Sequence, residues 1–213
     1  MTACDGRCRC AMPLRGRTGL VTQAERQPGS TFKTFVLTRA IQDGINPYTT
    51  LYGSKKLDFV DKQYGPIHVE TYSHTYRGAI PIASALLSSD NSVFQQLTLD
   101  VGPDKVIQTA YDMGIPKPRD PPDVASIGLG SGEVTPLDMA TAYSALSNGG
   151  YRVAPLAISK IVKPNGEVDT FAPERDRALT DGEAYEVTRI LQNNMTGGTG
   201  TTANIGVPAG GKT

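Results

Sequence analysis

The segment PGSTFKTFVLTRAIQDG, residues 28–44, joins a helix pattern to a pair of potentially reactive side chains. Its apolar residues recur at helical spacing and stop at the closing glycine. Ser30 and Lys33 lie three residues apart at the start of this helix, which puts both side chains on one face with Cβ atoms about 5 to 6 Å apart. Because a lysine kept partly neutral by burial or by another cation can deprotonate a serine, the segment predicts a nucleophile and its base.

Two later segments carry side chains that would complement this pair. Ser89-Asp90-Asn91 holds a hydroxyl and a carboxamide two residues apart, suited to relaying a proton and holding a peptide amide. The same residue types are also preferred helix N-caps. Lys212 and Thr213 offer a second cation and a hydroxyl for a carboxylate, within what is otherwise a glycine-rich tail. Taken alone, Ser-x-x-Lys is more often an ordinary surface helix turn and Ser-Asp-Asn is more often an N-cap, whereas Lys212-Thr213 fits a glycine-rich tail equally well.

The amino-acid composition excludes several functional classes for this chain. Lys plus Arg (21) equals Asp plus Glu (21), and the pI of about 6.7 gives no overall positive charge to hold nucleic acid or an anionic membrane. Hydrophobic residues make up 38% of the chain, which is typical of a soluble globular domain. The longest weakly polar run, residues 78–87, is much shorter than the roughly 20 residues of a membrane-spanning helix. We therefore expect partners to be recognised by local chemistry.

The three cysteines, Cys4, Cys8 and Cys10, all lie in the first ten residues, so they cannot cross-link the body of the chain. A zinc site would need a fourth ligand, and His68 and His74 are not at a metal-ligand spacing. We predict no metal site. Residues 1–19 are predicted to be an unstructured basic leader without the apolar region of a secretory signal.

Helix caps and turn residues predict the remaining elements. Capping boxes at Thr135 and Thr180 each begin a helix, and a proline in the first turn with a closing glycine marks another. Prolines within 116–122, together with Gly128, Gly130 and Gly132, predict a surface loop without helix. Residues 46–67 are predicted to be irregular or short strands. The predicted helices are 81–87, a segment after Asn91, 103–113, 135 to 148–150 and 180 to 197–198, with a β-hairpin from 156–162 and 168–171.

Ser-x-x-Lys, Ser-Asp-Asn and Lys-Thr, in this order, together resemble the signature of penicillin-binding proteins and serine β-lactamases. Flanking sequence makes the chain most similar to the transpeptidase domain of class A, bifunctional penicillin-binding proteins, from about residue 20 to the end. The flanking segments that carry this likeness are 22–33, 101–105, 133–137, 147–151 and 197–200. The chain differs from many relatives at Thr34, where they have proline, and in lacking the glycine that follows Lys-Thr.

The resemblance implies a serine-type D-alanyl-D-alanine transpeptidase that cross-links the cell wall. Ser30 would attack a stem peptide ending in D-Ala-D-Ala and form an acyl-enzyme. Lys33 would be the general base, and Ser89 would pass a proton to the departing D-alanine. A second strand's amine would then resolve the ester. β-Lactams would acylate Ser30 and inhibit the enzyme, and no cofactor is implied.

Substrate binding is implied for three further residues. Asn91 would hold the substrate amide, and Lys212 with Thr213 would bind its terminal carboxylate. A family oxyanion-hole donor lies just beyond the Lys-Thr-Gly strand, which the chain lacks. The implied location is the extracytoplasmic face of the cell membrane, although residues 1–213 contain no predicted export signal or membrane segment.

The implied fold is α+β, of the penicillin-binding protein and serine β-lactamase type. Residues 20–213 correspond mostly to its helical part, so we expect a partial domain, cut at both ends, with the antiparallel sheet largely missing. An alternative is a non-catalytic truncated remnant or interaction module with an exposed apolar face. A D,D-carboxypeptidase or a serine β-lactamase is less favoured, and the Glu-x-x-Leu-Asn motif of class A β-lactamases is absent from the sequence.

Overall fold

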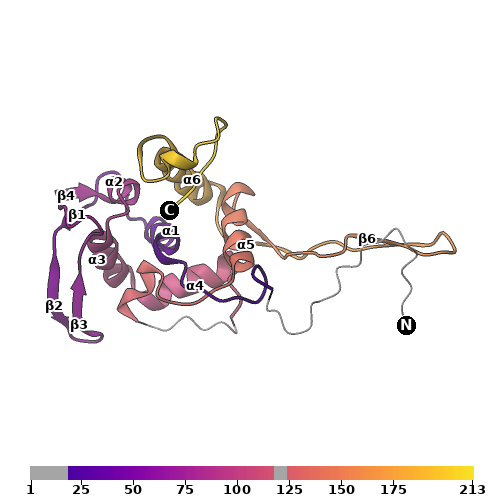
Figure 1. The fold of residues 1–213 in the computed structure, drawn as a ribbon, viewed down its shortest axis with the longest axis horizontal. Coiled ribbons are helices and arrows are strands. Elements are labelled where there is room, and N and C mark those ends of the chain that lie inside the picture. The colour runs from indigo at the N-terminus through magenta and orange to yellow at the C-terminus, as the bar shows by residue number, and fades with distance from the viewer. Residues whose placement is uncertain (1–18, 118–123) are drawn as a thin grey trace.

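A computed structural model describes residues 19–117 and 124–213, and the predictions for the basic leader and its cysteines lie outside these residues. The described chain is mainly helical, with a central helix enclosed by the others (Figure 1). Its α-helices are α1 (Lys33–Gln42), α2 (Ile82–Leu87), α3 (Asn91–Val101), α4 (Pro103–Met113), α5 (Pro136–Ser147) and α6 (Asp181–Gly197). Three 3₁₀ helices are η1 (Gly29–Phe32), η2 (Ala125–Leu129) and η3 (Thr201–Ala203). None of the helices in these ranges is long and apolar enough to cross a bilayer.

Within the described residues the strands pair two by two, and all four pairs are antiparallel. The pairs are β1 (Leu51–Ser54) with β4 (Gly78–Pro81), β2 (Leu57–Asp61) with β3 (Gly65–Val69), β5 (Tyr151–Val153) with β8 (Arg175–Arg177), and β6 (Lys160–Val162) with β7 (Val168–Thr170). The segment predicted to be irregular or short strands, residues 46–67, contains β1 and β2 and the start of β3. β1 pairs with the more distant β4. The α+β class is confirmed, and the described residues contain no sheet larger than two strands.

The first two strand pairs lie on the opposite side of the helical body from the last two, which form a projecting arm (Figure 1). The predicted hairpin is confirmed in this arm, although its strands are shorter than predicted. Ile161 pairs with Asp169 at the centre of β6 and β7. Because neither strand packs on a core, only the few residues next to the turn hold a regular ladder.

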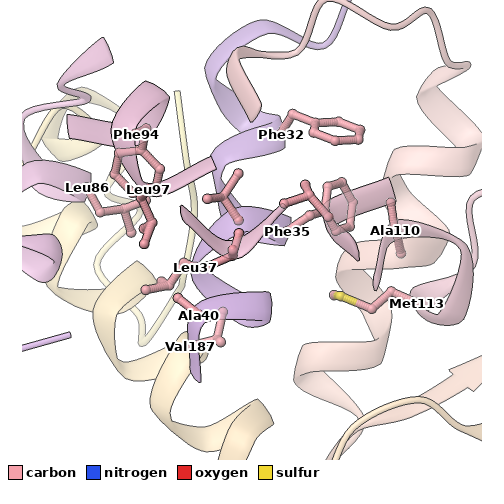
Figure 2. Packing of buried hydrophobic residues seen from close by; sticks show 14 of the residues in the cluster. Phe32, Phe35, Leu37, Ala40, Leu86, Phe94, Leu97, Ala110, Met113 and Val187 are labelled. Carbon is pink, nitrogen blue, oxygen red and sulfur yellow. The ribbon is translucent and has the colours of Figure 1, made fainter. Parts of the chain in front are cut away.

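Helix α1 is the centre of the hydrophobic core. Phe35, Val36 and Leu37 are consecutive, yet all are fully buried, so the helix is enclosed on every side. Figure 2 shows side chains from α2, α3, α4 and α6 gathered around it, among them Phe94 and Val187. A fully enclosed helix can hold its first residue away from water, and that residue is Lys33.

Both predicted capping boxes are confirmed. Thr135 Oγ1 accepts a hydrogen bond from the backbone N–H of Asp138, whose carboxylate accepts one from the N–H of Thr135. Thr180 and Glu183 make the same reciprocal pair at the start of α6. These contacts satisfy backbone donors that have no partner within the helix, which explains why both helices begin where the sequence predicts.

Two boundaries differ from the predictions. Helix α3 begins at Asn91, one residue early, because the Asp90 side chain caps it. The predicted surface loop without helix is wrong for 125–129, which form η2 with Ile127 and Gly128 buried. A Cβ at Gly128 would lie 1.9 Å from Thr98 Oγ1, so only glycine lets this turn pack against α3. Three of the prolines behind that prediction, at 118, 121 and 122, lie outside the described residues.

Candidate active site

Ser30 lies in the 3₁₀ turn η1, and not in the first turn of the α-helix as predicted. The turn is packed tightly, since a Cβ on Gly130 would come within 2.1 Å of the Gly29 carbonyl oxygen. On its other side, the Tyr143 hydroxyl donates to the Thr31 carbonyl oxygen at 2.7 Å. The half-buried Ser30 is therefore held in place by its neighbours on both sides.

Lys33 is the first residue of α1 and is fully buried. Its Nζ donates to the Ser89 carbonyl oxygen and to Asn91 Oδ1, both at 2.7 Å, and to Ser89 Oγ at 3.3 Å. Within the described residues, the Ser30 hydroxyl makes no hydrogen bond with this amine. The direct contact expected from the spacing is therefore replaced by contacts to the Ser89–Asn91 segment, whose three acceptors satisfy a buried ammonium group.

The segment between α2 and α3 is shaped to present those acceptors. Ser89 adopts a left-handed conformation with φ of 54°, which is unfavourable for a residue with a side chain. Asp90 follows it and is buried, with its carboxylate accepting hydrogen bonds from Ser54 Oγ at 2.6 Å and from the N–H of Val93 at 3.1 Å. These contacts fix the turn, so both the carbonyl and the hydroxyl of Ser89 face the lysine.

The C-terminal residues complete the cluster. Lys212 Nζ donates to Ser89 Oγ at 2.8 Å and to the carbonyl oxygen of the terminal Thr213. Asn194, buried in α6, donates to the Gly211 carbonyl oxygen at 2.8 Å and so ties this end of the chain to the helix (Figure 1). Lys33 and Lys212, which are far apart in the sequence, therefore both contact the hydroxyl oxygen of Ser89.

Burial and like charge change the acidity of both lysines. The pKa of Lys33 is lowered from 10.5 to about 7, first by burial and then by the charge of Lys212, while Asp90 opposes the change. Burial lowers the pKa of Lys212 to about 8. Near neutral pH the Lys33 amine is therefore partly deprotonated, as a general base requires.

A pocket of about 430 Å³ opens beside the cluster. Its lining residues are Ser30, Thr71, Tyr72, Ser73, Arg77, Ser88, Ser89, Asn91 and Thr199. Thr213 Oγ1 donates to Thr199 Oγ1 at 2.6 Å, so the hydroxyl predicted to bind the substrate carboxylate contacts the pocket wall. No carboxylate side chain belongs to this lining in the part of the chain that the structure describes.

Sequence reasoning missed several residues of this wall. Thr199 lies within the 197–200 segment that carries part of the family likeness, so a signal for it was present. The loop at 71–73 and Arg77 lie in a segment with weak periodicity, and they reach the pocket only because β4 pairs with the distant β1. The described residues contain no group of three or more potential metal ligands.

The sequence of residues 16–213 matches the family described as the penicillin binding protein transpeptidase domain. The chain belongs to this family. It is 34% identical over 180 residues to penicillin-binding protein 2D of Bacillus subtilis, and 33% identical over 186 residues to penicillin-binding protein 1A of Neisseria lactamica. These alignments cover 82% and 84% of the chain but 25% and 23% of the relatives, so the chain spans about a quarter of their length.

Solved structures of penicillin-binding proteins share the fold. A D,D-transpeptidase domain of a peptidoglycan glycosyltransferase from Eggerthella lenta superposes with a TM-score of 0.77 at 25% identity, covering 91% of this chain and 54% of that one. Penicillin-binding protein 1A from Haemophilus influenzae gives a TM-score of 0.77 at 18% identity, covering 90% and 32% respectively. The resemblance to a class A penicillin-binding protein transpeptidase domain is thus confirmed.

Proposed function

We propose that this penicillin-binding transpeptidase chain forms a serine acyl-enzyme with peptidoglycan stem peptides that end in D-Ala-D-Ala. Ser30 Oγ attacks the carbonyl carbon of the penultimate D-alanine, and its proton moves to Lys33. The C–N bond breaks, and the terminal D-alanine leaves with a proton delivered through Ser89. The amine of a second strand then attacks the ester, the Ser30 C–O bond breaks, and the serine regains its proton.

The burial of the Lys33 amine in contact with Ser89 and Asn91 is the observation that carries this proposal. A protonated amine has three N–H donors, which match its three acceptors in the cluster. A neutral amine has two, so it can keep the two contacts of 2.7 Å and release the longer one to Ser89 Oγ. Its lone pair is then available for a proton. The pKa of about 7 populates this neutral form near neutral pH.

The remaining residues have binding and relay roles in this proposal. Ser89 Oγ lies between the two lysines, in contact with both amines, so a proton can pass through it. Asn91 lies in the pocket lining with Ser30; its Oδ1 accepts from Lys33 Nζ at 2.7 Å and its Nδ2 donates to the Glu70 carbonyl oxygen at 3.1 Å. The second Nδ2 proton and the second Oδ1 lone pair are left for the substrate amide. Lys212 and Thr213 supply a cation and a hydroxyl for the terminal carboxylate. β-Lactams would acylate Ser30 as analogues of the D-Ala-D-Ala terminus.

Hydrolysis of the acyl-enzyme, as in a β-lactamase, needs a group that activates water. Carboxylates are typical general bases for that step, and the pocket lining includes none among the described residues. This favours a long-lived penicillin adduct and resolution by an amine. We also propose that the chain acts on the extracytoplasmic side of the membrane, where the peptidoglycan substrate is located.

Labelling with a fluorescent penicillin tests the proposal. We expect a covalent adduct on the folded chain that is lost in Ser30→Ala and kept in Ser84→Ala, since Ser84 is exposed on α2 outside the pocket lining. Mass spectrometry of the labelled chain should locate the adduct on the peptide that contains Ser30. A chain that melts cooperatively but forms no adduct would contradict the proposal and favour a non-catalytic binding module. Rapid penicillin turnover would indicate a β-lactamase.

A further inference from the structure

Arg77 is the only charged residue among the described residues that line the pocket. It shares the lining with Ser30, Ser89 and Asn91, but it enters from the segment just before β4 and not from a catalytic motif. The acyl-transfer proposal gives it no role. A charged side chain on the wall of a substrate pocket is a candidate for recognising a charge on the substrate.

The backbone of Arg77 is fixed relative to the cluster. Its N–H donates to Ser54 Oγ at 3.1 Å, and the same hydroxyl donates to the buried Asp90 carboxylate at 2.6 Å. Ser54 also pairs with Gly78 at the end of the β1–β4 ladder. Since Asp90 caps the helix that begins with Asn91, the position of Arg77 is coupled to the position of Asn91.

The guanidinium of Arg77, by contrast, has no hydrogen bond or ion pair within residues 19–117 and 124–213. The acidic residue of the adjoining loop is already engaged, because the Glu70 carboxylate contacts Lys56 at 2.6 Å and His74 at 2.8 Å. Arg77 is anchored through its backbone and its side chain is exposed, so the guanidinium is available to bind a carboxylate, for which its planar donors are well suited.

Two separate cationic groups therefore face this region, Lys212 at the cluster and Arg77 on the pocket wall. If Lys212 takes the terminal carboxylate and Asn91 takes the amide, the preceding residues of the peptide pass beyond Asn91 toward Arg77. We propose that Arg77 is a specificity residue that selects acyl donors with a second carboxylate on this preceding part. This inference rests on the proposed acyl transfer.

Two penicillins that differ by one carboxylate provide the test. Carbenicillin carries a carboxylate on its acyl side chain, and benzylpenicillin is the same molecule without it. The measured quantity is the ratio of their second-order acylation rates, which cancels effects common to both. We expect Arg77→Gln to lower the carbenicillin-to-benzylpenicillin ratio about fivefold, as for a charged contact exposed to solvent. Arg175→Gln, on the projecting arm, should leave the ratio unchanged.

A ratio that is unaffected by Arg77→Gln would overturn the inference while leaving the acyl transfer intact. A second measurement does not depend on acylation. In the Ser30→Ala variant, acetyl-Glu-D-Ala-D-Ala should bind about fivefold more tightly than acetyl-Gln-D-Ala-D-Ala by NMR titration, and adding Arg77→Gln should remove the difference. If no penicillin adduct forms at all, the acyl transfer fails, and equal binding of the two peptides would then refute the role of Arg77.

Discussion

Replacing Lys212 by methionine should change the pH at which the chain reacts with penicillin. Lys33 Nζ and Lys212 Nζ both contact Ser89 Oγ, at 3.3 and 2.8 Å, so the two nitrogens lie at most about 6 Å apart. Two positive charges at that distance repel by about 3 kcal/mol at an effective dielectric constant near 20 and by about 0.7 kcal/mol in bulk water. The pKa of Lys212 is about 8, so its amine is mostly charged at pH 7.

This repulsion helps to keep Lys33 neutral. A change of about 1.4 kcal/mol, within the range above, corresponds to one pKa unit. Removing the Lys212 charge would then reduce the neutral fraction of Lys33 at pH 7 about fivefold. We expect the acylation rate at pH 7 to fall by at least that factor. Burial is the larger cause of the lowered pKa, so Lys33 should still titrate below its ordinary value of 10.5.

The assay is the second-order rate of labelling by fluorescent penicillin from about pH 5 to about pH 10. The wild-type rate should rise through an inflection near the Lys33 pKa of about 7. Lys212→Met should move the inflection to higher pH, whereas Lys212→Arg, which keeps the charge, should leave it near the wild-type position. A loss of rate at every pH with no movement of the inflection would mean that Lys212 only binds the carboxylate. A wild-type rate that does not change between about pH 6 and about pH 8 would refute Lys33 as the base.

Two further predictions concern stability. The Lys33 pKa is about 7 in the folded chain and 10.5 in the unfolded chain, so the unfolded chain binds more protons between these pH values, and Lys33 makes the free energy of unfolding rise by about 2 kcal/mol from about pH 7 to about pH 9. Urea denaturation should show that this increment is absent in Lys33→Met. The same change of unfolding free energy with pH in the variant would contradict the buried amine. Gly130→Ala should destabilise the chain by at least about 2 kcal/mol more than Gly166→Ala. Both glycines have positive φ, but only at Gly130 would a Cβ meet backbone atoms, 2.1 Å from the Gly29 carbonyl oxygen. Equal melting temperatures for the two variants would mean that the turn at Ser30 relaxes freely.

Local sequence signals predicted the parts of the fold that are stabilised locally. Helices α5 and α6 are each preceded by a threonine cap with an acidic residue three positions later, which is the sequence signal of a capping box. Both capping boxes form in the structure. The sequence did not locate the individual strands between residues 51 and 81, because these strands are short and buried residues do not alternate clearly with exposed ones along them. β1 is held by pairing with β4, which begins 27 residues after Leu51, and no local pattern encodes such a pairing.

The candidate site was predictable in its residue types but not in its contacts. Three motifs in order identified their segments, and the structure brings these together. They are Ser30 with Lys33, residues 89–91, and Lys212 with Thr213. The helical spacing suggested that Lys33 contacts Ser30 directly. Buried in α1, its amine instead takes the acceptors offered by a distant turn, because an enclosed ammonium group without acceptors would be far more costly than a lost local contact. Tertiary burial therefore overrides the local geometry.

The unusual backbone at Ser89 follows from the same requirement. With φ of 54°, Ser89 turns its carbonyl and its hydroxyl toward one amine, and the next residue caps α3. The left-handed conformation costs on the order of 1 to 3 kcal/mol, which is comparable to a single unsatisfied buried donor. The strain at Ser89 is thus offset by the hydrogen bonds that keep Lys33 buried, and burial in turn lowers the pKa on which the proposed chemistry depends.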